Sequence, residues 1–477
     1  MRTRIFADEN RRWWTLGALA FALFMIMLDN TVVNVALPSI QRDLGIGLSE
    51  LEWTVNAYAL TFAVLMLTGG KLADFFGRRR VFLLGLVLFT LSSLACGLAT
   101  SGGTLIGART LQGVGAALML PATLSIISAT FPARQRGLAI GIWAGVSAMA
   151  LAIGPLIGGL ITEHIDWSWI FFVNVPIGIL GLLVGRVVIE ESRDTSSDQR
   201  LDLPGLLASG VGLFALTFAL IEANAYGWTD PVILGLFVLS ALSLAAFVLL
   251  ERHQRSPLLD LSLFRSSTFA GANVVALLVT LAMFGVFFFM SIYMQNILGY
   301  SATKTGAAFL PMTILIILIA PIAGRSSDRI GSRALMTAGM LCLAASLAIF
   351  SRLGLDSTFW DIFPGLIVGG FGVALVMTPM TAAALGSVPV EKSGVGSGVL
   401  NTFRQVGGAL GIAVMGAIVA SYVDLNGGRP DPASFIDGFQ TALTVSAGFA
   451  LLGAVVAWAT IRKHRHMDAG ELAEAAA

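Results

Sequence analysis

The chain of 477 residues is 56% hydrophobic and 12% charged, a composition that excludes an ordinary soluble protein and indicates a polytopic membrane protein. Its 29 Lys and Arg balance 28 Asp and Glu, so the net charge of +1 provides no general basic field for nucleic acid. The cysteines, Cys96 and Cys342, lie in apolar runs, which indicates free thiols packed as small hydrophobes rather than a disulfide or a metal pair.

Apolar runs of about 20 residues, each long enough to cross a hydrocarbon core as a helix, recur along the chain. The first extends for about 25 residues, longer than a signal-peptide core of about 7–15, and predicts a retained helix. Membrane β-strands are about 10 residues long and alternate in polarity, so we expect an all-α integral membrane protein with about fourteen transmembrane helices. The predicted spans lie near 14–37, 51–70, 81–100, 103–128, 137–162, 168–189, 203–222, 231–250, 268–296, 304–324, 334–351, 360–386, 395–420 and 437–461.

The distribution of Lys and Arg predicts the orientation of these spans. With the N-terminus in the cytoplasm, about 23 of the 29 fall on the cytoplasmic side, whereas the opposite topology would place them outside. The sequence therefore predicts a multi-pass protein of the cell (inner or plasma) membrane with both termini cytoplasmic. The cations expected outside are Arg42, Lys304, Arg352 and Arg429.

An internal repeat links "GKLADFFGRRR" at 70–80 to "GRSSDRIGSR" at 324–333. Glycine, aspartate and arginine positions recur at a spacing of 254, and two further glycine pairs recur at 257, as parallel repeats would. The repeat predicts an N-terminal six-helix bundle at 1–190, an extra two-helix hairpin with its links at 191–260, and a C-terminal six-helix bundle with a short tail at 261–477.

Further motifs accompany the repeat: "LDNTVVNVALP" at 28–38, "LIGARTLQGVGAA" at 105–117, "GPLIGG" at 154–159 and "DWSWIFFVNVPIG" at 166–178. Together they resemble the major facilitator superfamily, and the full set is similar to its fourteen-helix drug:proton antiporter (multidrug efflux) branch. The resemblance covers nearly the whole chain. It departs from the family pattern at Ser168, where arginine is usual, and at Ala150, where glycine is usual.

Asp29 is the most informative single residue, because a carboxylate within a span costs about 2.5–3.5 kcal/mol and is a functional candidate by default. It lies roughly 20 Å into the first predicted helix, and Arg109 lies at about the same depth in the fourth. The two side chains are expected to form either a proton-coupling site or a permanent ion pair that fixes helix packing.

The loop at 70–80 has two interpretations. Gly70 and Gly77 permit a tight turn, and Asp74 can accept hydrogen bonds from a helix N-terminus or an arginine. The family resemblance implies a cytoplasmic gate that favours the outward-open state; the alternative is a basic cluster that sets only the orientation. The residues of the predicted gate are Gly70, Asp74, Gly77, Arg78, Asp328 and Arg333.

The small residues of "GPLIGG", which are Gly154, Pro155, Gly158 and Gly159, permit close helix crossing and a kink. The resemblance implies that this helix shapes the cavity of exporters, although tight packing alone predicts the same residues. This motif is also the main feature that disfavours a proton-coupled importer.

Several other polar residues within the spans are candidates for a cavity. Arg404 is expected near the membrane midplane, and its two interpretations are contact with the substrate and a structural hydrogen bond to carbonyls. Glu222 is a candidate second acid, or else a solvated helix end. An adaptable apolar wall is expected around Met283 and Met290. The full set of polar cavity candidates is Asn30, Asn34, Gln112, Tyr293 and Arg404.

No phosphate-cradling, H-E-x-x-H or C-x-x-C motif occurs, so we expect no enzyme, no metal and no cofactor. The links are also too short for a soluble signalling domain. The predicted function is export of small amphipathic or hydrophobic compounds in exchange for protons, by alternating access. A dedicated exporter of one metabolite or antibiotic is the alternative. The expected partners are the substrate, protons and the bilayer, without nucleic acid, and the expected working unit is a monomer.

Overall fold

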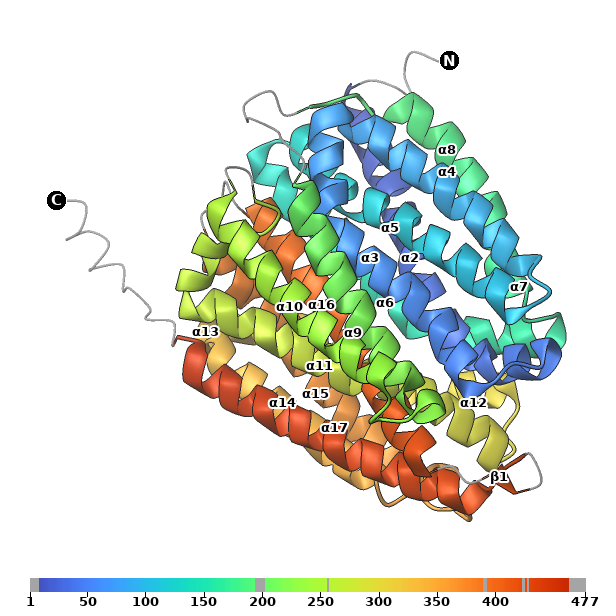
Figure 1. The fold of residues 1–477 in the computed structure, drawn as a ribbon. Coiled ribbons are helices and arrows are strands. Elements are labelled where there is room, and N and C mark those ends of the chain that lie inside the picture. Colours follow the sequence, from blue (N-terminus) through green and yellow to red (C-terminus); the bar gives the residue numbers. More distant parts are fainter. Residues whose placement is uncertain are drawn as a thin grey trace.

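The computed structural model describes residues 8–193, 202–254, 257–388, 393–422, 425–426 and 429–462. They form one bundle of long helices, shown in Figure 1. Within the described residues, 13 helices are long and apolar enough to cross a membrane. The 32-residue helix α6, several of whose side chains are outside the described set, comes in addition to these. The predicted all-helical fold is confirmed, and the count agrees approximately with fourteen.

The elements follow the predicted order. The first half comprises α2 (Asp8–Leu44), α3 (Leu48–Phe76), α4 (Arg78–Gly97), α5 (Gly102–Thr130), α6 (Ala133–His164), α7 (Trp169–Phe172) and α8 (Asn174–Val188). The hairpin is α9 (Leu203–Tyr226) and α10 (Pro231–His253). The second half comprises η1 (Leu261–Arg265), α11 (Ser267–Ile292), the π-helical η2 (Tyr293–Ile297), α12 (Ala302–Ala308), α13 (Leu310–Ile330), α14 (Ser332–Phe350), α15 (Phe359–Gly386), α16 (Ser393–Tyr422), the short strands β1 (Leu425–Asn426) and β2 (Arg429–Pro430), and α17 (Pro432–Thr460).

Two glycines separate consecutive helices at corresponding places in the repeat. Gly77 ends α3 with φ +112°, and Gly331 ends α13 with φ +86°. Such backbone angles are strained for any residue that carries a Cβ, so glycine allows the chain to turn directly into α4 and α14. The repeat found in the sequence therefore corresponds to the same turn made twice.

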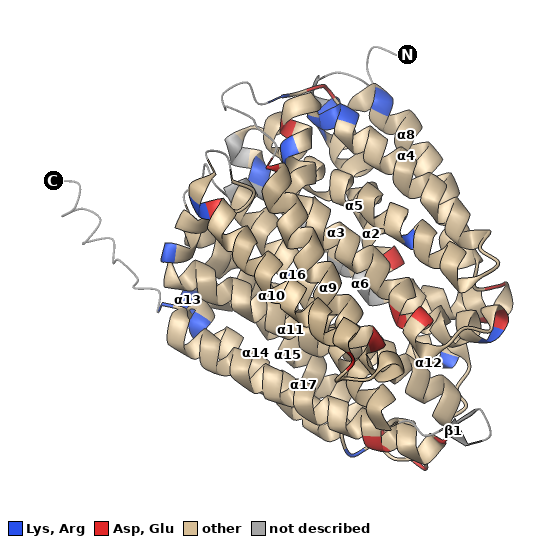
Figure 2. Ribbon diagram, viewed as in Figure 1, with Lys and Arg blue, Asp and Glu red and all other residues tan. Residues whose placement is uncertain are grey.

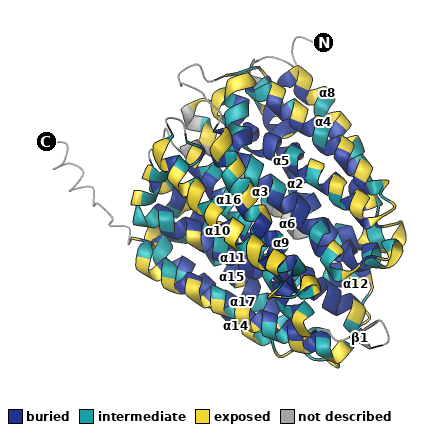
Figure 3. Ribbon diagram, in the orientation of Figure 1, coloured by how far each residue is buried: buried dark blue, intermediate teal, exposed yellow. Residues whose placement is uncertain are grey.

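The same helix pairs pack in each half. Helix α2 packs on α6 as α11 packs on α16, and α5 packs on both α3 and α4 as α15 packs on both α13 and α14. The ribbon is coloured as buried mainly where helices face one another and as exposed on the outward surfaces (Figure 3). Many exposed residues are large and apolar, such as Leu242, Val455 and Trp360, as a lipid-facing surface requires.

The bundle has two chemically different ends. Lys and Arg gather near the two chain termini, as Figure 2 shows, and we name the end where α3 turns into α4, at Arg78, Arg79 and Arg80, the arginine-rich end. The opposite end is where α2 finishes and α3 begins. At the opposite end, the Gln295 side chain of η2 donates a hydrogen bond of 2.8 Å to the carbonyl of Val35, which joins the two halves there.

Helix α9 of the extra hairpin packs against both halves, since it contacts α3 and α16. The ring of Trp53 on α3 lies 5.8 Å from the rings of both Phe214 and Phe218 on α9. Two turns further along α9, the Asn224 amide donates to the carbonyl of Ala417 on α16 over 2.7 Å. Helix α10 packs mainly on α9 and lies further out (Figure 1).

Candidate functional site

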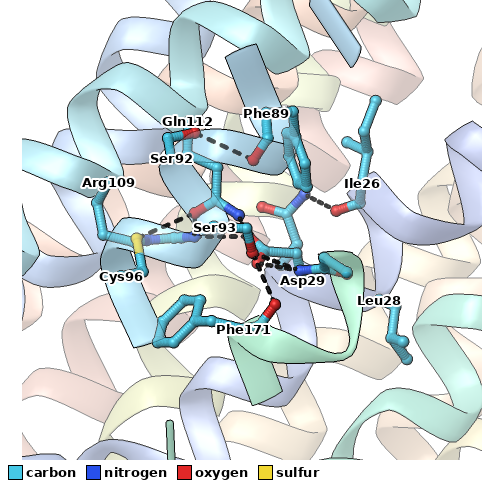
Figure 4. Close-up of polar contacts among 12 residues, drawn as sticks. Ile26, Leu28, Asp29, Phe89, Ser92, Ser93, Cys96, Arg109, Gln112 and Phe171 are labelled. Atoms are coloured by element: carbon cyan, nitrogen blue, oxygen red, sulfur yellow. Dashed lines mark hydrogen bonds and ion pairs between the residues drawn. The ribbon is translucent and has the colours of Figure 1, made fainter. Parts of the chain in front are cut away.

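The two charged residues predicted at one depth meet in the structure. Arg109 Nη1 on α5 lies 2.5 Å from Asp29 Oδ2 on α2, and both residues are 1% exposed (Figure 4). Because water is excluded here, either charge without the other would carry a large desolvation penalty. The ion pair therefore depends on α2 and α5 remaining packed together.

Amide side chains complete the shell around the Asp29 carboxylate. Gln112, one turn after Arg109, donates to Asp29 Oδ1 over 2.9 Å and accepts from Arg109 Nη1 over 2.7 Å. Asn174 on α8 donates to the same Oδ1 over 3.3 Å. Ser93 on α4 accepts from both amides and donates to the carbonyl of Phe171. Four long helices thus converge on one carboxylate.

The Arg109 guanidinium group also interacts with α3. Its Nε donates to the carbonyl of Thr54 on α3 over 3.1 Å, and its carbon lies 4.2 Å from the ring centre of Tyr58. A cation over an aromatic face is stabilised by the ring quadrupole, more so when water is excluded. Arg109 consequently has interactions that persist if Asp29 becomes neutral.

Ser93, Asn174 and Tyr58 were not among the residues predicted from the sequence. Asn174 lies in the motif at 166–178, and an amide in an apolar helix is a usable signal. Ser93 and Tyr58 offer no such signal, because serine and tyrosine are common in membrane helices. Only the packing of the helices shows that they face the ion pair.

The residues at 70–80 bond both within the first half and to the links of the hairpin, since Lys71 Nζ donates to the carbonyl of Pro257 over 2.6 Å. Asp74 accepts from Arg78 Nε over 2.9 Å, and Glu191, after α8, accepts from the Arg79 amide over 3.1 Å. A Cβ at Gly77 would overlap the Glu191 carboxylate, a second reason for glycine there besides its φ. Gly70 packs against Pro121 of α5 at ordinary contact distance. The gate function of this loop remains a prediction.

The second copy of the loop has a different environment. The Arg333 guanidinium carbon lies 4.0 Å from the ring centre of Trp458 on α17. Asp328 lies in α13, and its side chain is outside the described set. The repeat thus preserves the backbone turn more clearly than the side-chain contacts.

The "GPLIGG" motif packs on both halves. A Cβ at Gly154 would overlap Thr31, and one at Gly158 would lie 2.7 Å from the carbonyl oxygen of Val32, so these two glycines lie against α2. Gly159 faces the backbone of Ala302 on α12, in the other half. Pro155, on the same side, has its carbonyl against Gly306 of α12. The tight packing predicted for this motif is present, and it includes the contact between halves.

Most of the polar side chains predicted to line a cavity form hydrogen bonds to nearby groups of the protein. Asn30 and Asn34 each donate to a carbonyl one turn earlier in α2, and the Tyr293 hydroxyl donates to the carbonyl of Gly354 over 2.6 Å. Arg404 donates to the Thr381 hydroxyl over 3.0 Å, while its buried Nε has no hydrogen-bond partner. Of this group, Gln112 joins the ion pair and Arg404 retains an unused donor.

Met283 and Met290 line an apolar pocket in the second half, where an adaptable wall was expected. Phe287 on α11, Phe309 at the N-cap of α13 and Met312 within α13 contribute to the same pocket. The cavity has a volume of about 20 Å³, close to the space that one water molecule needs, so it does not hold a drug-sized compound in this state.

Glu222, expected either as a second acid or as a solvated helix end, is partly buried. Its Oε1 accepts hydrogen bonds from Ser49 over 2.6 Å and from the Trp53 indole over 3.0 Å. The end of α9 lies against the start of α3, which removes this carboxylate from free solution. Its role as an acid remains a prediction.

Comparison with known proteins identifies the family. The family model described as Major Facilitator Superfamily matches residues 19–412. The chain belongs to the major facilitator superfamily. As a member of that superfamily it is a multi-pass membrane transporter rather than an enzyme.

Curated relatives of this major facilitator include resistance proteins. It is 40% identical to the puromycin resistance protein pur8 of Streptomyces alboniger, over 95% of this chain and 92% of that one. It is 38% identical to the tetracenomycin C resistance and export protein of Streptomyces glaucescens, over 87% of this chain and 77% of that one. A bacterial homologue of the lysosomal transporter Spinster shares the fold, with a TM-score of 0.66 at 16% identity, over 95% of this chain and 97% of that one.

Proposed function

We propose that this transporter exports small hydrophobic or amphipathic compounds in exchange for protons, by alternating access. The observation that carries the proton coupling is the Asp29–Arg109 pair, a carboxylate and a cation buried in one half of the bundle. The names of these relatives, which include resistance and export, support export as the direction of transport. No cofactor is needed, because the proton gradient supplies the energy.

The pair can exchange a proton without disrupting the site. A proton on Asp29 neutralises the carboxylate and ends its attraction to Arg109, which keeps its bonds to Thr54 and Gln112. Loss of that proton re-forms the ion pair, with Gln112 and Asn174 donating to the negative charge. The structure then corresponds to the proton-free state.

We assign the arginine-rich end, with both chain termini, to the cytoplasm, because Lys and Arg concentrate on that side of membrane proteins. The halves then meet at their outer ends, where Gly159 lies against Ala302 and Gln295 bonds to Val35. In this scheme the proton-free ion pair coincides with closure towards the outside. Substrate enters from the cytoplasm as the proton leaves, and a proton displaces substrate outside.

The buried Arg404 Nε, which has no hydrogen-bond partner, offers one polar contact to a compound in the interior. A membrane potential of about 150 mV acting on one uncompensated proton can sustain roughly 300-fold accumulation. A dedicated exporter of one antibiotic is the second candidate, because both relatives above are named for a single compound. We propose that one chain is the working unit, since one chain supplies the whole ion pair.

The test is proton movement in energised everted vesicles upon addition of cationic, neutral and anionic compounds. Wild type should dissipate the proton gradient, and Asp29→Asn should not, because the amide cannot exchange a proton. Asp43→Asn, an exposed change on the same helix, is the matched control and should behave as wild type. A response to several dissimilar compounds supports multidrug export, and a response to one supports the dedicated exporter. Full activity of Asp29→Asn would refute the coupling role.

A further inference from the structure

A second acid is buried at the opposite end of the bundle. Glu52, one turn into α3, is 2% exposed, and its Oε2 has no hydrogen-bond partner. Among the ion pairs formed by the described residues, none includes Glu52. An isolated buried carboxylate is strongly disfavoured in its charged form, so it either binds a proton or leaves the interior.

The position of Glu52 is defined by the contact between the halves. Its carboxyl group lies directly on Gly416 of α16, where a Cβ in place of the glycine hydrogen would overlap both carboxyl oxygens. Helix α16 presents Met415, Gly416 and Ala417 at this level, none of which is charged. The two halves can therefore pack here only around a group that does not require water.

The groups that face Glu52 favour its neutral form. Helix α9 supplies Glu222, which accepts hydrogen bonds from Ser49 and Trp53 on either side of Glu52, and its negative charge opposes a second one. On α5, Arg109 is committed to Asp29 and to the carbonyl of Thr54. On α3 itself, Glu50 is exposed and accepts from the amide of Gly47.

We propose that Glu52 is a second proton-binding site of this transporter, and that its neutral form is required for the halves to close at this end. The proton binds at Oε2 from water on that side and returns to water on the same side when the halves separate, so no other bond changes. Identification of this side as the outside rests on the proposed function. The proton on Glu52 is then a gating proton, separate from the transported one.

The extra hairpin acquires a role in this scheme. Glu222 is held by Ser49 and Trp53 of the first half, while Asn224 bonds to Ala417 of the second. Helix α9 thereby covers Glu52 from the side and holds the charged Glu222 close to it. Acid on this side should favour the closed state, and alkali should favour separation.

The experiment measures the separation of the halves directly. Spin labels at Gly103→Cys in the first half and Asp356→Cys in the second, both exposed at the opposite end, report their distance in nanodiscs. Both native cysteines are replaced, and Asp29→Asn is present in every sample so that Asp29 contributes no pH dependence. The distance is recorded between about pH 5 and pH 9, the range over which such carboxyl groups titrate when buried.

We expect the parent distance to lengthen as the pH rises. Glu52→Gln should keep the short distance throughout, because glutamine stays neutral. Glu222→Gln should move the midpoint to lower pH by about 1 unit, because it removes a like charge. Glu50→Gln is the matched control on the same helix and should follow the parent.

The proposal is overturned if the distance between the labels in Glu52→Gln changes with pH as it does in the parent. It is also overturned if the distance in the parent does not depend on pH. Samples are first checked for a single symmetric peak on size exclusion, so that misfolded protein is not measured. Failure of the proposed antiport appears in a different experiment, the vesicle assay with wild type and Asp29→Asn. The two failures are therefore distinguishable.

Discussion

Replacement of Arg109 by glutamine tests whether the buried pair acts as a unit. Arg109→Gln removes the bonds from the guanidinium to Asp29, Gln112 and the carbonyl of Thr54, and leaves Asp29 with donors only from Gln112 and Asn174. Loss of one partner from a buried ion pair costs about 3–5 kcal/mol, because the remaining charge stays out of water. We therefore expect the free energy of unfolding to fall by about that amount.

The double variant Asp29→Asn/Arg109→Gln removes both charges and should recover part of the loss. We expect a coupling free energy of about 2–3 kcal/mol from the four proteins, measured by chemical unfolding in micelles of one composition. Arg252→Gln, which changes an exposed arginine at the end of α10, is the control and should change stability by less than about 0.5 kcal/mol. Additivity of the two single changes within about 0.5 kcal/mol would refute the energetic pairing.

Three further changes test other parts of the site. Gly159→Val places a branched side chain against the backbone of α12, so export should fall at least about tenfold. The control Gly107→Ala, which adds a methyl group in open space on α5, should export normally. Equal export by the two variants would contradict the packing argument. Asp74→Asn should reduce turnover in vesicles although its partly exposed ion pair with Arg78 contributes only about 1 kcal/mol to stability, and an unchanged rate would leave the loop only an orientation role. Arg404→Gln should weaken export of anionic compounds more than of neutral ones, whereas a uniform loss would indicate a structural role.

Much of the architecture was predictable because a hydrocarbon environment leaves few ways to satisfy backbone groups. Continuous apolar runs therefore predict helices, and the recurring Gly77 and Gly331 predict a repeated turn that the structure contains. The depths of Asp29 and Arg109 could be estimated from helix rise alone, and these residues do meet.

Other parts of the site could not be predicted, because they depend on which helices are neighbours. Ser93 and Asn174 come from helices far apart in the sequence, and no periodicity assigns them to Asp29. Glu52 was not predicted as a site for a related reason. A glutamate one turn from the start of a span has the pattern of a solvated helix end, and the packing of Gly416 from the other half, beside α9, buries it.

The place of α9 beside both halves has a consequence for the ancestry of such chains. Without α9, the side of α3 that carries Ser49 and Trp53 would face acyl chains, and Glu52 would lose its cover. A carboxylate bordering hydrocarbon is selected against, so a lineage that discards the hairpin must also exchange this glutamate for an uncharged residue. The hairpin and the acid should accordingly be inherited together, and lost together.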